Sequence, residues 1–262
     1  MITAGIDVGS LTAKAVIWDS GEEAVRGQAL LRLAHDPAAA GRLVLQAALA
    51  AADLPAEAIE ACSGTGYGRI ALDFVDYRIT EISCHARGVH HVLPQVRTVL
   101  DIGGQDCKAI ALDEAGRALD FEMNDRCAAG TGRFLEVMAG ALGLELSGLA
   151  DLALTAHDPA TLSSTCTVFA ESEVIGLLAQ GRDRADLAAG LCRAVAQRVV
   201  AMTQRLGLTP QVALTGGVAL NAAVRDALQE LLGLPVVVPP DPQLTGALGA
   251  ALLAADRRIA ER

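Results

Sequence analysis

The hydrophobic pattern of the chain predicts two β-hairpins that resemble each other. In residues 4–19, apolar positions flank a short turn that carries Asp, Gly and Ser, and residues 98–113 show a similar arrangement around an Asp- and Gly-containing turn. Apolar runs of this length on both sides of such a turn are typical of a strand, a tight turn and a second strand. We therefore expect one hairpin at the start of the chain and a related one later.

The two hairpins match without a gap when the first is shifted along the chain. The matched pairs are Asp7 with Asp101, Gly9 with Gly103, Lys14 with Lys108, Ala15 with Ala109 and Asp19 with Asp113. Lys14 and Lys108 are the only lysines in the chain, and Arg supplies the other basic side chains. The match indicates an internal duplication, and the paired lysines indicate a need for a compact ammonium group near each turn.

Helical spacing of apolar residues accounts for much of the remaining chain. The segments with this spacing are residues 36–54, 185–206 and 244–262. Two more helices are expected to follow the cysteine-containing segments that end near residues 134 and 169. Strands that alternate with helices in this way favour an α/β fold.

The charge and hydropathy of the chain exclude several classes of protein. A net charge of −10 argues against a nucleic-acid partner, which would need a basic face. The longest apolar run, residues 244–255, is too short for a membrane span, which needs about 20 residues. Since the first strand begins at once, we expect no secretory signal and a soluble, cytoplasmic protein.

Two of the six cysteines stand out by their neighbours. Cys127 precedes Ala-Ala-Gly-Thr-Gly and an apolar-periodic run, and Cys166 leads into another such run. Both thiols are therefore expected at or just before a helix N-terminus, which favours a thiolate or an anionic ligand. The chain has no C-x-x-C pair, and a cytosolic chain of this length is not expected to use a disulfide framework.

The other four cysteines are expected to play a smaller part. Cys62, Cys107 and Cys192 are predicted to be buried small hydrophobic residues, whereas Cys84, among polar neighbours, is left open between burial and chemistry.

The turns of the two hairpins have the composition of a phosphate-binding device. Their glycines let the backbone approach phosphate oxygens, and Ser10 and Gly104 add donors. Asp7 and Asp101 are expected at the hairpin tips, with little burial, where they can hold Mg²⁺ through its waters.

A third segment completes the expected nucleotide site. Residues 211–221 are predicted to form a buried strand that ends in Gly-Gly, followed by a helix, where the base and ribose of a nucleotide can rest. Other nucleotide motifs are excluded, because the chain has no P-loop and Arg69 stands where a dinucleotide motif needs its last glycine.

These segments together resemble the superfamily of acetate and sugar kinases, heat-shock chaperones and actin. The resemblance implies a two-lobed, duplicated, ribonuclease H-like α/β fold with ATP in a cleft between the lobes. We expect lobe I in residues 1–95, to which the closing helix 244–262 returns, and lobe II in residues 96–243.

Within that superfamily, five motifs are similar to those of the ATPases that activate 2-hydroxyacyl-CoA dehydratases and of the related benzoyl-CoA reductase subunits. The motifs are residues 63–69, 80–86, 101–106, 123–134 and 163–173. The resemblance extends from about Gly5 to Gly249.

The resemblance also implies the roles of individual residues. Cys127 and Cys166 match the family's cluster ligands. The expected catalytic residues are Asp7, Asp101 and Gln105. The expected nucleotide contacts are Gly9, Ser10, Ala13, Lys14, Gly103, Gly104, Lys108, Gly216, Gly217 and Asn221.

Family membership would further imply the cofactors and partners. A dimer would share one 4Fe-4S cluster, and binding and hydrolysis of ATP with Mg²⁺, yielding ADP, would drive one electron to an iron–sulfur dehydratase or reductase component. Reduced ferredoxin or flavodoxin is the expected electron source, and the dimer would contain either two copies of this chain or a sister subunit.

Two other functions remain open from the residues alone. A small-molecule kinase of pantothenate or N-acetylhexosamine type would use the same ATP site, with Asp125 as its base, but has no use for the two cysteines. A chaperone or filament ATPase would need more chain. His85, His90 and His91 are expected to be solvated or capping residues rather than a metal site, and Glu171 and Glu173 to complement a helix dipole.

Overall fold

The computed structural model describes residues 1–33, 36–124, 126–163 and 166–262. The chain forms two compact units. Unit 1 comprises residues 1–97, 112–119 and 239–262, and unit 2 comprises residues 98–111 and 120–238. Among the described residues, no helix has both the length and the apolar character of a membrane span.

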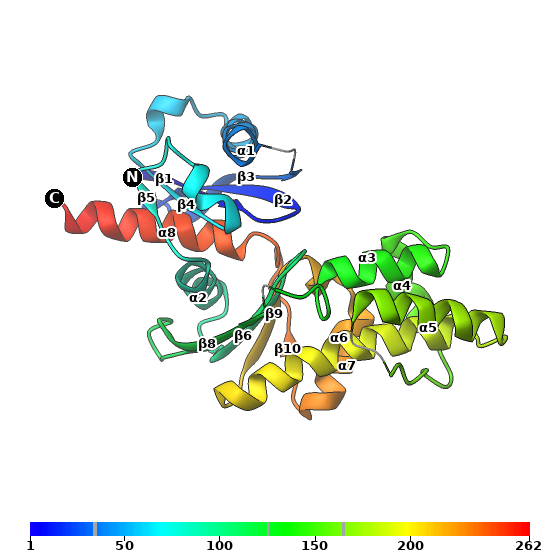
Figure 1. The fold of residues 1–262 in the computed structure, drawn as a ribbon. Coiled ribbons are helices and arrows are strands. Elements are labelled where there is room, and N and C mark those ends of the chain that lie inside the picture. Colours follow the sequence, from blue (N-terminus) through cyan, green and yellow to red (C-terminus); the bar gives the residue numbers. More distant parts are fainter. Residues whose placement is uncertain (34–35, 125, 164–165) are drawn as a thin grey trace. The chain divides into compact units, whose positions relative to one another are not determined.

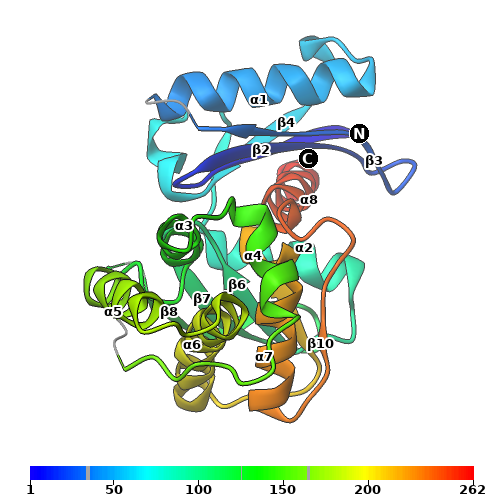
Figure 2. The ribbon, with the colours of Figure 1, turned by 90° about the vertical axis from the view of Figure 1, so that its right-hand side faces the viewer.

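Unit 1 is a five-stranded sheet covered by helices on both faces (Figures 1 and 2). The strand order is β3-β2-β1-β4-β5. The strands are β1 (Ile2–Val8), β2 (Thr12–Asp19), β3 (Ala24–Arg32), β4 (Ala61–Thr65) and β5 (Tyr77–Arg78). Helix α1 (Pro37–Ala52) covers one face and the C-terminal helix α8 (Thr245–Ala260) covers the other, with α2 (Glu81–Val92) packed against α8.

Local capping explains where α1 begins and ends. Asp36 accepts hydrogen bonds from the backbone N–H groups of Ala38 and Ala39, and Pro37 occupies the first turn, where a missing N–H costs nothing. Asp53 ends the helix in the left-handed conformation. The helices predicted over residues 36–54, 185–206 and 244–262 are all confirmed, to within two residues at each end.

Glycines bring α2 and α8 unusually close together. A Cβ atom at Gly249 would overlap the carbonyl oxygen of Cys84 and lie 2.9 Å from the amide nitrogen of Gly88. A Cβ atom at Gly88 would likewise overlap the carbonyl oxygen of Thr245. The crossing of the two helices therefore requires both glycines.

We expect Gly249→Ala to destabilise the protein by about 3 kcal/mol, the upper part of the range for overpacking, because backbone rather than a flexible side chain opposes the new methyl group. Urea denaturation measures the change. Gly148→Ala in α4 is the matched control, since no atom lies within 4 Å of its Cβ position, and it should raise stability by about 0.5 kcal/mol. A small effect at Gly249 would contradict this packing.

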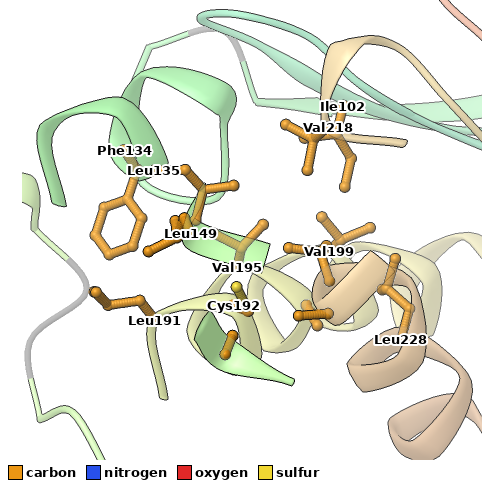
Figure 3. Close-up of a cluster of buried hydrophobic side chains, with 14 of the residues drawn as sticks. Ile102, Phe134, Leu135, Leu149, Leu191, Cys192, Val195, Val199, Val218 and Leu228 are labelled. Carbon is orange, nitrogen blue, oxygen red and sulfur yellow. The ribbon is translucent and has the colours of Figure 1, made fainter. Parts of the chain in front are cut away.

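Unit 2 repeats the sheet of unit 1 and adds more helices. Its strand order is β10-β9-β6-β7-β8. The strands are β6 (Thr98–Ile102), β7 (Cys107–Leu112), β8 (Ala118–Asn124), β9 (Val212–Thr215) and β10 (Val236–Val237). The helices are α3 (Gly132–Ala141), α4 (Leu146–Ala153), α5 (Thr167–Ala179), α6 (Arg184–Leu206) and α7 (Ala222–Leu232). Figure 3 shows the core, where Leu135, Leu149 and Val195 meet side chains from β6 and α7.

The two sheets have the same topology, which confirms the predicted duplication. β1 and β6 each pair antiparallel with the next strand in sequence and parallel with a later one, β4 and β9 respectively. Within the hairpins, Asp7 lies opposite Lys14 and Asp101 opposite Lys108. The same local sequence thus produces the same register twice.

Candidate nucleotide and cluster sites

The first hairpin places a carboxylate and an ammonium group side by side. Asp7, near the end of β1, lies 3.1 Å from Lys14 Nζ through its Oδ2 atom. The turn is closed by the N–H of Gly9, which donates to the carbonyl of Thr12 over 3.0 Å. A Cβ atom at Gly246 on α8 would lie 3.2 Å from Asp7 Oδ2, so this helix packs directly beside the carboxylate.

The second hairpin repeats this arrangement with further contacts. Lys108 Nζ lies 3.3 Å from Asp101 Oδ2 and 2.7 Å from Asp106 Oδ2. The hydroxyl of Thr215 donates to Asp101 Oδ1 over 2.9 Å. The N–H of Gly103 donates to the carbonyl of Asp106 over 2.9 Å, which closes the same turn as in the first hairpin.

The expectation that both aspartates have little burial is wrong. Asp7 is 5% exposed and Asp101 is 3% exposed. Each belongs to the middle strand of its sheet rather than to the tip of a projecting hairpin, and each is satisfied by a lysine. Burial of a carboxylate is tolerated when an ammonium group pairs with it, and the pair is then held in a fixed geometry.

In each unit, a glycine follows the strand that pairs parallel with the middle strand, which is β4 in unit 1 and β9 in unit 2. Gly66 after β4 has φ +89° and Gly216 after β9 has φ +84°, a conformation that favours glycine. A Cβ atom at Gly216 would overlap the carbonyl oxygen of Ile102 and lie 3.0 Å from Asp101 Oδ1. Gly216 therefore brings the backbone after β9 against the second hairpin.

The segment after Gly216 differs from the expectation in one detail. A 3₁₀ turn, Gly217–Leu220, separates the glycines from α7, which begins at Ala222. Asn221 caps that helix, because its side-chain oxygen accepts from the N–H of Val224 over 3.0 Å. The predicted strand and helix are therefore both present, with one short turn between them.

Most of the remaining predicted nucleotide contacts lie in the two hairpin turns. Ser10, Gly103 and Gly104 are partly exposed and Gln105 is exposed, whereas Ala13 is buried in β2 and Gly217 is exposed in the 3₁₀ turn. Gly9 is also partly exposed. Backbone groups of both turns are therefore accessible within their own units, as a phosphate-binding turn requires.

The second turn is also attached to α3. The carbonyl of Gly103 accepts from the N–H of Gly132 over 2.9 Å, and the carbonyl of Gly104 accepts from the N–H of Arg133 over 2.8 Å. These two amides belong to the first turn of α3, which lacks partners within the helix. The hairpin turn thus caps the helix that follows the Cys127 segment.

Cys127 and Cys166 differ from the other cysteines in exposure. Both are exposed, whereas the other four are buried. Burial raises the pKa of the Cys62, Cys84 and Cys192 thiols to about 12 and that of Cys107 to about 11. The predicted burial of Cys62, Cys107 and Cys192 is confirmed, and Cys84 proves to be buried as well.

The two exposed cysteines have different local settings. Cys166 is the N-cap residue of α5, as predicted. Cys127 lies in a loop ahead of α3, whose first residue is Gly132. Asn124 fixes this loop, because its side-chain amide donates to the carbonyl of Cys127 over 3.0 Å and to that of Ala129 over 3.2 Å. Cys127 therefore lies before a helix start but not on it.

A cluster site within one chain would be incomplete. Among the described residues, no group of three or more His, Cys, Asp or Glu side chains is placed to hold a metal ion. A 4Fe-4S cluster takes four thiolates. The two exposed thiols, with the remaining cysteines buried, would supply two of these four ligands.

The other candidate residues take structural places or lie outside the described chain. His85 is buried, with Nδ1 3.1 Å from the Thr245 hydroxyl, so its expected solvated role is wrong. His91 packs edge-on against Trp18. Glu173 accepts from the N–H of Ser163 over 2.8 Å. Asp125, the base that a kinase would use, lies outside the described residues.

Sequence reasoning missed Asp106 and Thr215 as members of the second hairpin site. Asp106 was included in a family motif but was given no role of its own. In the alignment of the two hairpins it differs from the matching residue, Thr12. That difference between the repeats was the available signal. Thr215 comes from a strand more than a hundred residues away, and no local pattern links it to Asp101.

Two units with the same sheet order, each with an Asp–Lys hairpin and a glycine after its central parallel strand, define the two-lobed α/β class to which actin and the sugar kinases belong. Within that class, the chain belongs to the BadF/BadG/BcrA/BcrD ATPase family, whose model matches residues 4–254.

Close relatives match along nearly their whole length. An activator of lactoyl-CoA dehydratase from Anaerotignum propionicum is 48% identical, over 97% of each chain. The solved structure of the activator of the 2-hydroxyisocaproyl-CoA dehydratase from Clostridium difficile with bound ADPNP has a TM-score of 0.94 at 42% identity, over 100% of this chain and 97% of the other. Component A of the (R)-2-hydroxyglutaryl-CoA dehydratase from Acidaminococcus fermentans has a TM-score of 0.95 at 43% identity, over 99% of each.

Proposed function

We propose that this protein is an ATP-dependent one-electron donor that activates an iron–sulfur acyl-CoA dehydratase of the 2-hydroxyacyl-CoA type or a benzoyl-CoA reductase. It acts in the cytoplasm as a dimer, with reduced ferredoxin or flavodoxin as the electron source. The observation that carries the proposal is the attachment of the second hairpin turn to α3, the helix that follows the exposed Cys127. The names of the close relatives support the same activity.

The two hairpins and the segment after β9 are assigned to the nucleotide. Backbone N–H groups of Ser10 and Gly104 donate to phosphate oxygens, Gly9 lets the backbone of the first turn approach them, and the turn from Gly216 to Asn221 receives the adenosine. Asp7 and Asp101 would hold Mg²⁺ through its waters, which suits a cation that dehydrates reluctantly. Gln105, which is exposed at the second turn, orients the attacking water.

Cys127 and Cys166 of two chains would hold one 4Fe-4S cluster, which supplies one-electron transfer at low potential. Exposure of both thiols in one chain suits ligands that a second copy must reach. Cys166 is the N-cap residue of α5, and Cys127 lies in the loop that leads into α3.

Two hydrogen bonds provide a route from nucleotide to cluster segment. The carbonyls of Gly103 and Gly104 hold the first amides of α3, so a shift of this turn when the phosphate is lost displaces the start of that helix. Asn124 joins the Cys127 loop to the same region. Nucleotide state thereby changes the surroundings of one ligand segment directly.

A small-molecule kinase explains fewer of the observations. It would use the same hairpins but leaves the two exposed cysteines, and the attachment of the second turn to the helix after Cys127, without a role. The close relatives are also named as activators rather than kinases.

Anaerobic purification of the full chain tests the proposal. We expect a brown protein with a broad sulfur-to-iron charge-transfer band, which hydrolyses ATP and transfers one electron to a dehydratase component only while ATP is present. ADP in place of ATP is the control and should support no transfer. A colourless, iron-free protein that phosphorylates a sugar or pantothenate would refute the proposal and favour the kinase.

A further inference from the structure

The two hairpins place opposite charges at the same point of their turns. In the first hairpin, a Cβ atom at Gly9 would lie 3.2 Å from Lys14 Nζ. In the second, a Cβ atom at the matching Gly103 would overlap Asp106 Oδ1. An ammonium group therefore borders the first turn, and a carboxylate borders the second.

A single sequence difference between the repeats accounts for this reversal. Asp106 occupies the position that Thr12 holds in the first hairpin, and both residues close the turn through their backbone carbonyls. Asp106 Oδ2 lies 2.7 Å from Lys108 Nζ and forms an ion pair with it. The side chain of Thr12 has no carboxylate, so it offers Lys14 no such partner. Thr12 is partly exposed, so a longer acidic side chain has room there.

The two lysines consequently differ in burial and in charge balance. Lys108 is 2% exposed and lies between two carboxylates, Asp101 and Asp106. The side chain of Lys14 is 13% exposed and pairs with Asp7 alone among the described residues. A phosphate at the first turn meets an ammonium group beside the backbone donors, whereas at the second turn it meets backbone donors beside a carboxylate.

We propose that only the first hairpin contributes a lysine to the nucleotide: Lys14 binds its phosphates, whereas Asp106 holds Lys108 as a buried positioning residue for Asp101. This inference rests on the proposed ATP site and revises the expected role of Lys108. Asp106 is the residue that sets the difference, since it neutralises Lys108 and occupies the space above Gly103. The duplicated hairpins have thus taken different roles.

Chemical labelling of the holoprotein distinguishes the two lysines. An acyl-phosphate derivative of ATP transfers its acyl group to an amine beside the bound phosphates, and the chain contains only two lysines. We expect peptide mass spectrometry to find the label on Lys14, with protection by ADP, and little on Lys108. Labelling of Lys108 to a similar extent, or of neither lysine in a protein that binds ADP, would overturn the inference but leave the ATP site intact. Failure to bind ADP at all would overturn the proposed function as well.

Transfer of the acidic residue to the first hairpin provides a second test. Thr12→Asp should draw Lys14 into a second ion pair and weaken ADP binding by about tenfold or more, the usual size of a lost charge-assisted contact. Adenosine, which has no phosphate, should bind as to the unmodified chain. Thr12→Asn is the matched control and should bind ADP almost normally. Equal losses for ADP and adenosine, or unchanged ADP affinity in Thr12→Asp, would contradict the assignment of Lys14.

Discussion

Changing either Cys127 or Cys166 to Ser is expected to remove the iron–sulfur cluster completely. One chain supplies two exposed thiols, so a cluster that needs four thiolates loses two of them in a symmetric dimer when either cysteine is changed. Anaerobic iron analysis should give about two iron atoms per unmodified chain and none per variant. The dimer should also loosen, since the cluster joins the two chains.

Cys62→Ser and Cys192→Ser are the matched controls. Both thiols are buried, and burial raises their pKa to about 12, which keeps them protonated and unsuited to bind iron. Each control should retain the full iron content with a modest loss of stability. About four irons per chain, or an intact cluster in Cys166→Ser, would refute a shared site.

Replacing Asp101 by Asn is expected to lower the rate of ATP hydrolysis by about a hundredfold or more, as for other groups that stabilise charge in a transition state. The carboxylate lies between Thr215 and Lys108. Asn keeps its volume and one acceptor oxygen, and Lys108 keeps its ion pair with Asp106. The loss should therefore fall on the rate rather than on folding. Steady-state hydrolysis at saturating Mg²⁺ and ATP measures it, with iron content as the check on the fold.

The choice of Asn follows from the burial of Asp101. Alanine would remove both acceptor oxygens and leave a cavity beside Lys108, which is 2% exposed. Asp120→Asn on β8 is the control, because Asp120 is exposed and bonds only its neighbour's N–H among the contacts described. Normal hydrolysis in Asp101→Asn would remove this hairpin from the ATP site.

Local sequence was sufficient to predict the hairpins, their duplication and the long helices. Asp36 and Pro37 mark the start of α1 through short-range hydrogen bonds and a fixed φ, and the shift that aligns Asp7 with Asp101 reproduces the observed register. These features depend on residues close in the chain. They can therefore be predicted before any tertiary contact is known.

The burial and partners of the site residues were not predictable in the same way. Asp7 is buried partly because Gly246, on a helix from the other end of the chain, packs against it. Asp101 receives a hydrogen bond from Thr215, and no periodicity encodes that pairing. The loop from Cys127 to Thr131 delays the start of α3, since Gly130 adopts φ +84° and Thr131 bonds the carbonyl of Ala128.

Because α8 packs on the sheet of unit 1, this unit cannot finish folding until α8 has been synthesised. Strand β1 is made long before the helix that covers it, whose Ala251 carbonyl accepts a hydrogen bond from the Thr3 hydroxyl. Residues 120–238, the larger part of unit 2, are complete before that helix exists. One apolar face of the first sheet must therefore stay uncovered while this part of unit 2 is made, and α8 completes unit 1 only afterwards.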